Sequence, residues 1–388
     1  MLTATQKITR TPCNMNRVEQ YLAAKLNERT EAGNLRQLTT RRAEVDFYSN
    51  DYLGLVTTGA LAAMMHMPGN DTTGSTGSRL LSGNTLQAEA LEQTIAAFHK
   101  AEAALLFNSG YDANMGLLAS ITNRHTTILS DELCHASLID GIRLSQSSRK
   151  YKFRHNDCND LSEKLKKHND EGQVVVVVES IYSMDGDMAP LADMATLCEA
   201  HDAQLVVDEA HATGVIGARG EGVVSALGLQ DKVFARVHTF GKALGCHGAA
   251  VVGSELLKQY LINFARPFIY TTALPGHSVH AAHTAYQYLA SHSFSNKPLH
   301  DLIAYLRLRI KETGMPGWKD SASAIQALIV GDNNRCRQIA AKLQQAGLQV
   351  NPILHPTVPL GMERLRVCLH SFNTQVQVDV LFDNLLSA

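Results

Sequence analysis

Three side chains that could act on a carbonyl or an amine follow short apolar stretches in the middle of the chain. Lys242 lies in "VHTFGKALG", among glycines and shortly after Thr239. Asp208 ends the apolar run of "QLVVDEAH", and His211 comes soon after it. A lysine amine can form an imine with an aldehyde, but most lysines are solvated surface residues. The residues that accompany Lys242 therefore decide its role.

Two further segments could hold a planar, phosphorylated ligand. In "LLFNSGYDAN", Ser109, Gly110 and Tyr111 follow a strand and begin a helix, whose free N–H groups suit a phosphate. The same residues also fit a plain serine N-cap with a turn glycine. His135, in "SDELCHASL", could stack on a ring or be a hydrogen-bonded structural histidine.

Together these groups match the needs of pyridoxal 5'-phosphate. Its aldehyde requires a lysine, here Lys242, and its pyridine nitrogen requires a carboxylate, here Asp208. A flat group covers the ring face, and donors such as Thr239 reach the phosphate. The sequence therefore predicts a pyridoxal-phosphate site, in which the glycines around Lys242 leave room for the cofactor.

Rival interpretations of the same segments fail. "VVDEAH" also spells a helicase-type magnesium motif, but the GxxxxGK[ST] phosphate loop is absent, since Arg236 and Ala243 occupy two of its positions. Glycines 214, 217, 220 and 222 do not match the dinucleotide pattern GxGxxG. In "YSMDGDMAPL" we expect Ser183, Asp185 and Asp187 to be structural residues of a turn.

The composition is that of an ordinary globular protein. Of 388 residues, 45% are hydrophobic and 19% charged, and the net charge of −2 offers no field for nucleic acid or an anionic membrane. No apolar run approaches the ~20 residues that span a bilayer, and we expect no signal peptide. The seven cysteines are scattered without a CxxC pair, which predicts no metal site, no disulfide framework and a cytoplasmic location.

The pattern of elements predicts an α/β fold. Short apolar strands at 103–107, 126–131, 173–180, 204–211 and 248–254 alternate with helical stretches, which is typical of a mainly parallel sheet. The uninterrupted valines of 173–180 indicate a strand buried on both faces. After residue 275 the pattern changes to helices and short strands, which predicts a smaller α+β domain.

With these residues in view, the chain from about Val18 onward resembles the α-oxoamine synthases, pyridoxal-phosphate enzymes of the aspartate-aminotransferase fold (fold type I). The segments that carry the resemblance are "SNDYLGL", "GSTGSRLLSGN", "NSGYDAN", "CHASLIDGIRLS", "YSMDGDMAPL", "VVDEAHATGVIG", "HTFGKALG", "ARPFIYTTALP", "SAIQALIVGDN" and "HPTVPLGMERLRV". We expect an N-terminal helical segment (1–50), a large cofactor-binding domain (51–275) and a small C-terminal domain (276–388).

The resemblance implies a role for each matching residue. Lys242 forms the imine, Asp208 pairs with the pyridinium nitrogen and His135 stacks on the ring. His211 and Ser183 contact the phenolate oxygen. Implied phosphate ligands are Ser109, Gly110, Tyr111 and Thr239, together with Thr271 and Thr272, which reach the partner subunit's phosphate in a homodimer. Implied substrate ligands are Asn50 and Arg366 for the amino-acid carboxylate and Arg36 for the acyl chain.

The implied reaction is a decarboxylative condensation of an amino acid with an acyl thioester, with Lys242 as the base and its pKa lowered. The motifs favour L-alanine and a pimeloyl thioester, on coenzyme A or an acyl carrier protein, as in biotin synthesis. The alternatives are a glycine C-acyltransferase or another α-oxoamine synthase that uses a different amino acid or acyl chain. Where some relatives carry an arginine before "PTVP", this chain has Leu354 and His355, which puts recognition of a terminal carboxylate on the acyl chain in question.

One basic segment has no place in the implied site. "RLSQSSRKYKFRH" concentrates positive charge in an otherwise balanced chain, through Arg143, Arg149, Lys150, Lys152 and Arg154. The segment is either a solvated edge or a docking surface for the negatively charged carrier of the acyl group.

Overall fold

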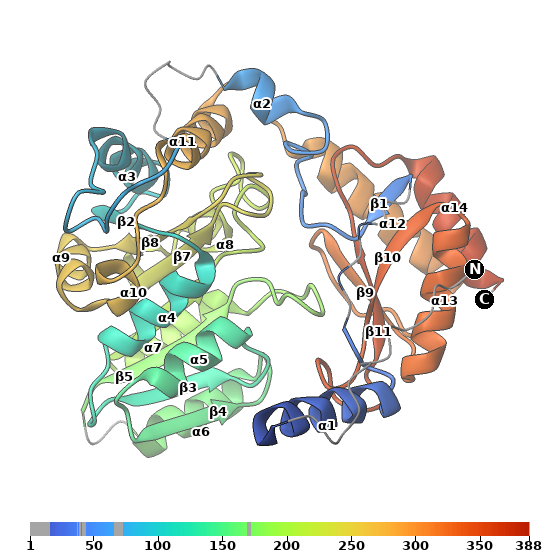
Figure 1. Ribbon diagram of the computed structural model, residues 1–388, viewed down its shortest axis with the longest axis horizontal. Coiled ribbons are helices and arrows are strands. Elements are labelled where there is room, and N and C mark those ends of the chain that lie inside the picture. The colour runs from blue at the N-terminus through green and yellow to red at the C-terminus, as the bar shows by residue number, and fades with distance from the viewer. Residues whose placement is uncertain are drawn as a thin grey trace.

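The computed structural model describes residues 16–36, 38, 40, 44–65, 73–168 and 172–387. Residues 1–15, where we expect no signal peptide, lie outside the described residues. Within the described part, two sheets lie side by side, a seven-stranded one and a four-stranded one, and each carries its own helices (Figure 1).

The seven-stranded sheet has the order β2-β8-β7-β6-β5-β3-β4. Its strands in chain order are β2 (Ala103–Phe107), β3 (Thr127–Asp131), β4 (Arg149–Phe153), β5 (Val174–Glu179), β6 (Ala203–Asp208), β7 (Ala235–Thr239) and β8 (Ala249–Gly253). All neighbours are parallel except β8, which runs antiparallel to both β7 and β2. The prediction of a mainly parallel sheet is confirmed, and β8 is the exception.

Both faces of this sheet are covered by helices, which explains its apolar strands. On β5, Val174, Val176 and Val178 join one core and Val175 and Val177 the other, as predicted for a strand buried on both faces. Helices α4 (Gly110–Ser120), α5 (Ala136–Leu144), α9 (Glu255–Phe264) and α10 (Arg266–Ile269) cover one face. Helices α6 (Cys158–His168), α7 (Leu191–Ala200) and α8 (Val223–Ala226) cover the other, followed by the 3₁₀ turn η3 (Gln230–Lys232).

A third core lies at the β2–β8 edge of the sheet. Helices α2 (Ala60–Met64), α3 (Leu86–Phe98) and α11 (Gly276–Ala290) pack there against apolar residues of the two strands. Thr85 begins α3 as its N-cap, accepting a hydrogen bond from the N–H of Ala88 at 3.1 Å. This core therefore packs residues 60–107 against residues 249–290, two stretches that are far apart in the sequence.

The small sheet has the order β1-β10-β11-β9. Its strands are β1 (Val45–Phe47), β9 (Ile325–Ile329), β10 (Leu348–Ile353) and β11 (Arg364–Cys368), and they pack on α12 (Lys297–Thr313), α13 (Asn333–Gln345) and α14 (Gln375–Leu386). The strand β1 pairs in parallel with β10, so a segment before residue 50 belongs to the sheet of the C-terminal part. The expected domain boundaries at residues 50 and 275 remain predictions.

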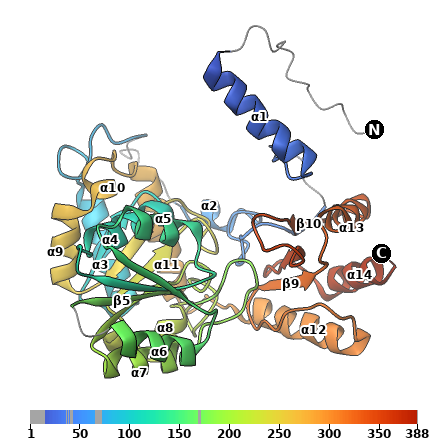
Figure 2. The same cartoon turned by 90° about the horizontal axis from the view of Figure 1, so that it is seen from below.

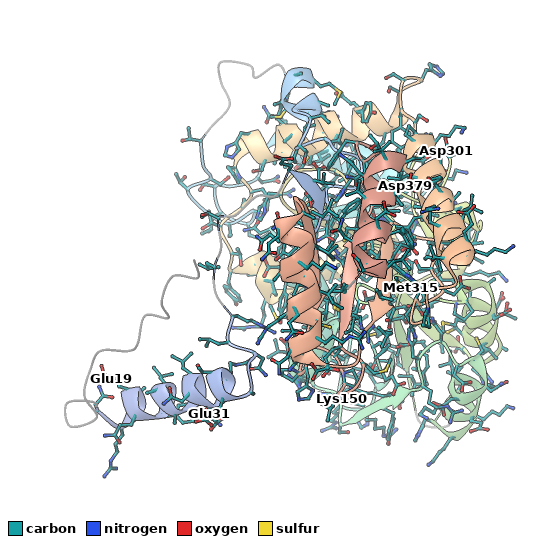
Figure 3. The ribbon with its side chains drawn as sticks, turned by 90° about the vertical axis from the view of Figure 1, so that its right-hand side faces the viewer. Glu19, Glu31, Lys150, Asp301, Met315 and Asp379 are labelled. Carbon is teal, nitrogen blue, oxygen red and sulfur yellow. The ribbon has the colours of Figure 1, made fainter. Side chains whose placement is uncertain are left out.

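Helix α1 (Arg17–Glu31) stands apart from both sheets (Figures 2 and 3). None of its residues is buried, so the apolar side chains of Val18, Tyr21, Leu22 and Leu26 are exposed. None of the described helices is both long and apolar enough to cross a membrane. The six described cysteines are free thiols, and Cys13 lies outside the described residues.

Candidate active site

Lys242 follows β7 and begins a chain of hydrogen bonds. Its Nζ lies 2.7 Å from Nε2 of His211, and Nδ1 of His211 lies 2.8 Å from the hydroxyl of Tyr52. The Tyr52 hydroxyl donates to Oδ1 of Asn50 at 3.0 Å, and the same oxygen accepts a hydrogen bond from Nη2 of Arg366 at 3.1 Å. The chain therefore connects the end of the large sheet to β11 of the small sheet.

The order of donors in this chain assigns the protons. Since Tyr52 donates to Asn50, its oxygen accepts from Nδ1 of His211, and Nε2 of His211 is left to accept from Lys242. Burial, with the nearby cations of Lys242 and Arg366, holds the pKa of His211 well below its ordinary value, so the ring is neutral. Burial also lowers the pKa of Lys242, to about 8, although Asp208 and Glu179 oppose the shift.

Asp208 ends β6 with its carboxylate held by neutral donors. Oδ2 accepts a hydrogen bond from Nδ2 of Asn114 at 2.7 Å, and Oδ1 accepts one from the N–H of Ala210 at 2.8 Å. The residue is 5% exposed, and within the described part of the chain no cation forms an ion pair with it. A buried carboxylate that lacks a directly paired cation is costly, so Asp208 is suited to a positively charged ligand atom.

Glu179 lies beside Asp208, because β5 and β6 are paired in register at these two residues. Burial and the neighbouring Asp208 raise the pKa of Glu179 to about 8. Its Oε1 accepts a hydrogen bond from the N–H of His135 at 2.6 Å. Glu179 thus fixes the start of α5, which carries His135.

His135 is held with its ring facing the cavity. Nδ1 lies 2.8 Å from the hydroxyl of Ser137 and accepts a hydrogen bond from the Ser137 N–H at 3.2 Å, so the proton of the neutral ring is on Nε2. The Ser137 hydroxyl also accepts a hydrogen bond from Asn114. Burial lowers the pKa of His135, which favours the neutral ring expected of a group that stacks on a planar ligand.

The N-terminus of α4 also lines the cavity. Ser109 is its N-cap and accepts a hydrogen bond from the N–H of Asp112 at 3.1 Å. A Cβ on Gly110 would lie 2.3 Å from Cγ2 of Thr239, so only glycine allows this close approach of helix and strand. The hydroxyl oxygen of Thr239 is buried without a hydrogen-bond partner. Tyr111 is exposed at the rim, with its hydroxyl on Asp140.

Most of these groups line one cavity of about 310 Å³, whereas Tyr52 and Arg366 are not among its described lining residues. It brings together most of the predicted site residues, namely Asn50, Ser109, Gly110, Tyr111, His135, Asp208, His211, Thr239 and Lys242. Within the described residues, no cluster of three or more potential metal ligands occurs.

The remaining predicted residues lie elsewhere. Ser183 is buried, and its carbonyl oxygen, not its hydroxyl, accepts a hydrogen bond from Nε of Arg366 at 2.7 Å. Thr271 lines a separate hollow with Arg79, and the carbonyl of Thr272 accepts a hydrogen bond from Asn108.

Arg36 lies outside the cavity, in a second hollow of about 610 Å³ near β10. Nη2 of Arg36 donates to Thr357 there at 3.2 Å. Arg29, Arg337 and His355 line the same hollow, and no acidic residue is among its described lining residues. Leu354 is also part of this lining.

The cavity fits pyridoxal 5'-phosphate on three observations. The unpartnered hydroxyl of Thr239 and the free N–H groups at the start of α4 can bind a phosphate. Asp208 offers an anionic oxygen to a protonated ring nitrogen. The amine of Lys242 lines the same cavity, where it can meet an aldehyde.

Comparison with known proteins agrees with this fit. A family model described as aminotransferase class I and II matches residues 42–385. The chain belongs to this family. It is 41% identical over 371 residues to an 8-amino-7-oxononanoate synthase of Emericella nidulans, covering 88% of this chain and 89% of that protein. It is 38% identical over 380 residues to the 8-amino-7-oxononanoate synthase of Cellvibrio japonicus, covering 94% and 95% of the two chains.

Among solved structures, the fold is similar to one described as SPT with PLP internal aldimine. The TM-score is 0.85 at 26% sequence identity, and the match covers 96% of this chain and 98% of that chain. The predicted fold and the resemblance to pyridoxal-phosphate enzymes of this aminotransferase family are therefore confirmed.

Three residues of the site were not singled out from the sequence. Tyr52 and Asn114 lie within segments that carry the family resemblance, "SNDYLGL" and "NSGYDAN", but neither residue type is distinctive by itself. Glu179 had a signal, because it ends the buried valine strand just as Asp208 ends the next strand.

Proposed function

We propose that the protein is a pyridoxal-phosphate-dependent acyltransferase that condenses L-alanine with a pimeloyl thioester. The products are 8-amino-7-oxononanoate, carbon dioxide and the free thiol of the carrier, and the reaction belongs to biotin synthesis. The observation that carries this conclusion is the cavity that joins Lys242, Asp208, His135 and His211 in a chain 41% and 38% identical to synthases of that name.

Bound in this cavity, pyridoxal 5'-phosphate supplies an aldehyde that condenses with amines and a protonated ring that accepts electrons. Asp208 would hold the ring nitrogen in its protonated form, and His135 would lie on the ring face. Thr239 and the N–H groups of Gly110 and Tyr111 would bind the phosphate. Ser109 contributes as the N-cap that orients these N–H groups.

Lys242 is suited to move the proton at Cα of the amino acid. With a pKa of about 8, a useful fraction of its amine is neutral near pH 7, and the amine is still basic enough to accept a proton. His211 accepts a hydrogen bond from Nζ and so directs the amine within the cavity. Because His211 is neutral, it does not add a second positive charge beside Lys242.

Arg366 and Asn50 are proposed to bind the carboxylate of the amino acid. Arg366 is 4% exposed, and its described neighbours give it no carboxylate partner, while Asn50 lines the Lys242 cavity. A guanidinium pairs well with a carboxylate through two parallel hydrogen bonds. Arg36 is proposed to contact the acyl chain, from the hollow beside β10.

We further propose that the active unit is a cytoplasmic homodimer. Thr271 and Thr272 lie outside the Lys242 cavity of their own chain, which is compatible with ligands that act on a second copy. Helix α1 exposes Val18, Tyr21 and Leu22 without burying any residue, so its apolar face is available to a partner subunit.

The proposal is tested by assaying purified protein with L-alanine, glycine or L-serine against pimeloyl-coenzyme A and pimeloyl-acyl carrier protein. Thiol release and mass spectrometry of the amino ketone report the reaction. We expect L-alanine to give 8-amino-7-oxononanoate with at least one of the two carriers. A clear preference for glycine would instead assign a glycine C-acyltransferase, and thiol release with none of the three amino acids would contradict an acyltransferase.

A further inference from the structure

Residues 181–188, which follow β5, form a closed turn that we call the strut. Ile181 and Met188 pair across an isolated antiparallel bridge. Within the turn, the N–H of Tyr182 donates to the carbonyl of Asp187 at 3.0 Å, and the N–H of Gly186 donates to the carbonyl of Tyr182 at 2.8 Å. The strut leaves the seven-stranded sheet and contacts the small sheet (Figure 1).

The tip of the strut is embedded in the small sheet. Asp185 and Arg364 of β11 form an ion pair, and the two residues are only 4% and 3% exposed. The carbonyl of Gly186 accepts a hydrogen bond from the hydroxyl of Ser321 at 2.8 Å. A Cβ on Gly186 would lie 2.1 Å from the carbonyl oxygen of Ile325, so the backbone approach requires glycine.

The base of the strut is anchored to the large sheet by His155. Its Nε2 lies 2.6 Å from Oδ2 of Asp187, and its Nδ1 lies 3.0 Å from Oδ1 of Asp131, which ends β3. Nδ2 of Asn156 donates to the same Asp187 oxygen at 2.8 Å. The strut is therefore fixed to one sheet at its base and to the other at its tip.

Arg364 and Arg366 are two residues apart on β11, so both side chains leave the same face of the strand. The strut contacts both of them. Asp185 binds Arg364, and the carbonyl of Ser183 accepts the hydrogen bond from Nε of Arg366. Through Nη2, Arg366 then reaches Asn50 at the Lys242 cavity.

We propose that the strut positions Arg366 for the amino-acid substrate, and that Asp185 is a positioning residue which acts through Arg364. The inference rests on the proposed function, in which Arg366 binds the amino-acid carboxylate. Without the Asp185–Arg364 pair, β11 loses a buried anchor and Arg364 is left as an uncompensated buried charge. A guanidinium displaced by about 1 Å binds its carboxylate poorly, because the benefit of a positioned group depends on its geometry.

The test compares Asp185→Asn, which keeps the shape and removes the charge, with Asp185→Asn combined with Arg364→Gln. We expect the KM for L-alanine to rise about 10- to 100-fold in Asp185→Asn, while the KM for the acyl thioester stays within twofold of the wild type. Because the two residues act through one contact, the double variant should be no worse than the more affected single variant. Ser321→Ala removes the hydrogen bond to the Gly186 carbonyl at the tip, together with those to Ile325 and Ser323, but keeps the ion pair, and it should raise the alanine KM less.

Alanine binding is also titrated directly on the holoenzyme by its visible spectrum, without acyl thioester, so a failure of the proposed acyl transfer leaves this measurement intact. The control is Asp160→Asn, which removes a buried carboxylate paired with Lys164 at 2.7 Å on α6, outside the strut. We expect the control to lower the melting temperature without changing alanine affinity. The proposal is overturned if Asp185→Asn binds alanine like the wild type, or if it weakens both substrates equally. Should Asp185→Asn not fold, unchanged alanine affinity in Ser321→Ala overturns it.

Discussion

At the scale of single residues, the environment of Lys242 makes its amine reactive near neutral pH. Burial lowers the pKa of Lys242 from 10.5 to about 8, so the neutral amine is half populated near pH 8. We expect the rate at which cofactor-free protein takes up pyridoxal 5'-phosphate to rise with pH and level off above about 8. Stopped-flow absorbance measures this rate. A rate that still climbs at pH 10 would indicate an ordinary lysine, and Lys242→Ala should develop no lysine-dependent visible band at any pH.

Asp208 should matter for turnover more than for cofactor binding. Asp208→Asn keeps the shape of the side chain but removes the charge that we propose holds the ring nitrogen protonated. We expect cofactor content to fall little and kcat to fall severely, by an amount that corresponds to several kcal/mol of transition-state stabilisation. Absorbance gives the cofactor content and thiol release gives kcat. Near-normal turnover would contradict the role, and Asn114→Ala, which removes one donor to Asp208, should have a smaller effect.

The residues that could be predicted from the sequence share a local signal. Lys242, Asp208 and His211 are reactive side chains at strand ends, and a parallel sheet gathers such ends at one edge. Tyr52 could not be found this way, because it contacts His211 across 159 residues of sequence. The tip of the strut could not be found either. Asp185 lies in a sequence typical of an ordinary turn, and its role depends on Arg364, which is 179 residues away in the sequence.

At the scale of elements, the basic segment proves to be the edge strand β4 with its flanks. Its cations are not equivalent: Arg143 pairs with Asp140 and Arg154 with Asp157. Lys150 is at the surface of the molecule (Figure 3), where its Nζ donates to two backbone carbonyls. Lysine on an edge strand also discourages pairing with another sheet, so a structural role would account for these cations without a docking partner.

A docking role for β4 remains a prediction with a measurable result. Neutralising Arg149, Lys150 and Lys152 together should raise the KM for the acyl thioester and flatten its dependence on salt, because both possible carriers are negatively charged. The KM for alanine should not change. Steady-state kinetics at low and high salt measure both effects. If the triple variant keeps the wild-type acyl-thioester KM at low salt, β4 is an ordinary edge strand.

The base of the strut should make stability depend on pH. Asp131 and Asp187 raise the pKa of His155 from 6.5 to about 10, against the effect of burial, and the Tyr182 ring packs on the imidazole. Because the folded protein binds the His155 proton more tightly than the unfolded chain does, the charged imidazole stabilises the fold fully below pH 6.5. This stabilisation is lost as pH rises through about 10. We expect the melting temperature of the wild type to exceed that of His155→Gln by several degrees at pH 6.5 and to converge on it above pH 10.

A matched control for this pH dependence is His168→Gln. Burial and nearby lysines lower the pKa of His168, so this substitution should produce no such convergence. A constant difference in melting temperature between wild type and His155→Gln across the pH range would show that His155 is neutral in the folded protein.

At the scale of the whole molecule, the strands with an apolar run were predictable, whereas the parallel strands β4 and β7 and the direction of β8 were not. The predicted strands at 103–107, 126–131, 173–180 and 204–211 carry continuous apolar runs, and all four are present. The direction of β8 cannot be predicted from its composition, since it depends on the path of the chain after Lys242. β1 is three residues long and gains its partner, β10, from the far end of the chain.

The proposed homodimer predicts that each active site contains residues of both subunits, and this can be tested by mixing two variants. Lys242→Ala removes the reactive amine, whereas Thr271→Ala with Thr272→Ala removes hydroxyls that we assign to the partner's phosphate. If these threonines act on the partner subunit, a mixed dimer of the two variants contains one site with both defects and one intact site. We therefore expect each variant alone to be impaired and the re-equilibrated mixture to regain activity, up to about a quarter of the wild-type value if subunits pair at random.

Light scattering during size exclusion checks that the mixture is dimeric. A mixture of wild type with Lys242→Ala is the control, because its activity should stay at half the wild-type value however the subunits pair. Cofactor affinity of the threonine variant adds a second measurement. Losing one charge-assisted hydrogen bond to a phosphate costs about 1.5–3 kcal/mol, which raises the dissociation constant roughly tenfold to hundredfold. If the threonines act within their own chain, every site in the mixture keeps a defect. Activity would then stay at the average of the two variants, and the assignment of Thr271 and Thr272 to the partner would be wrong.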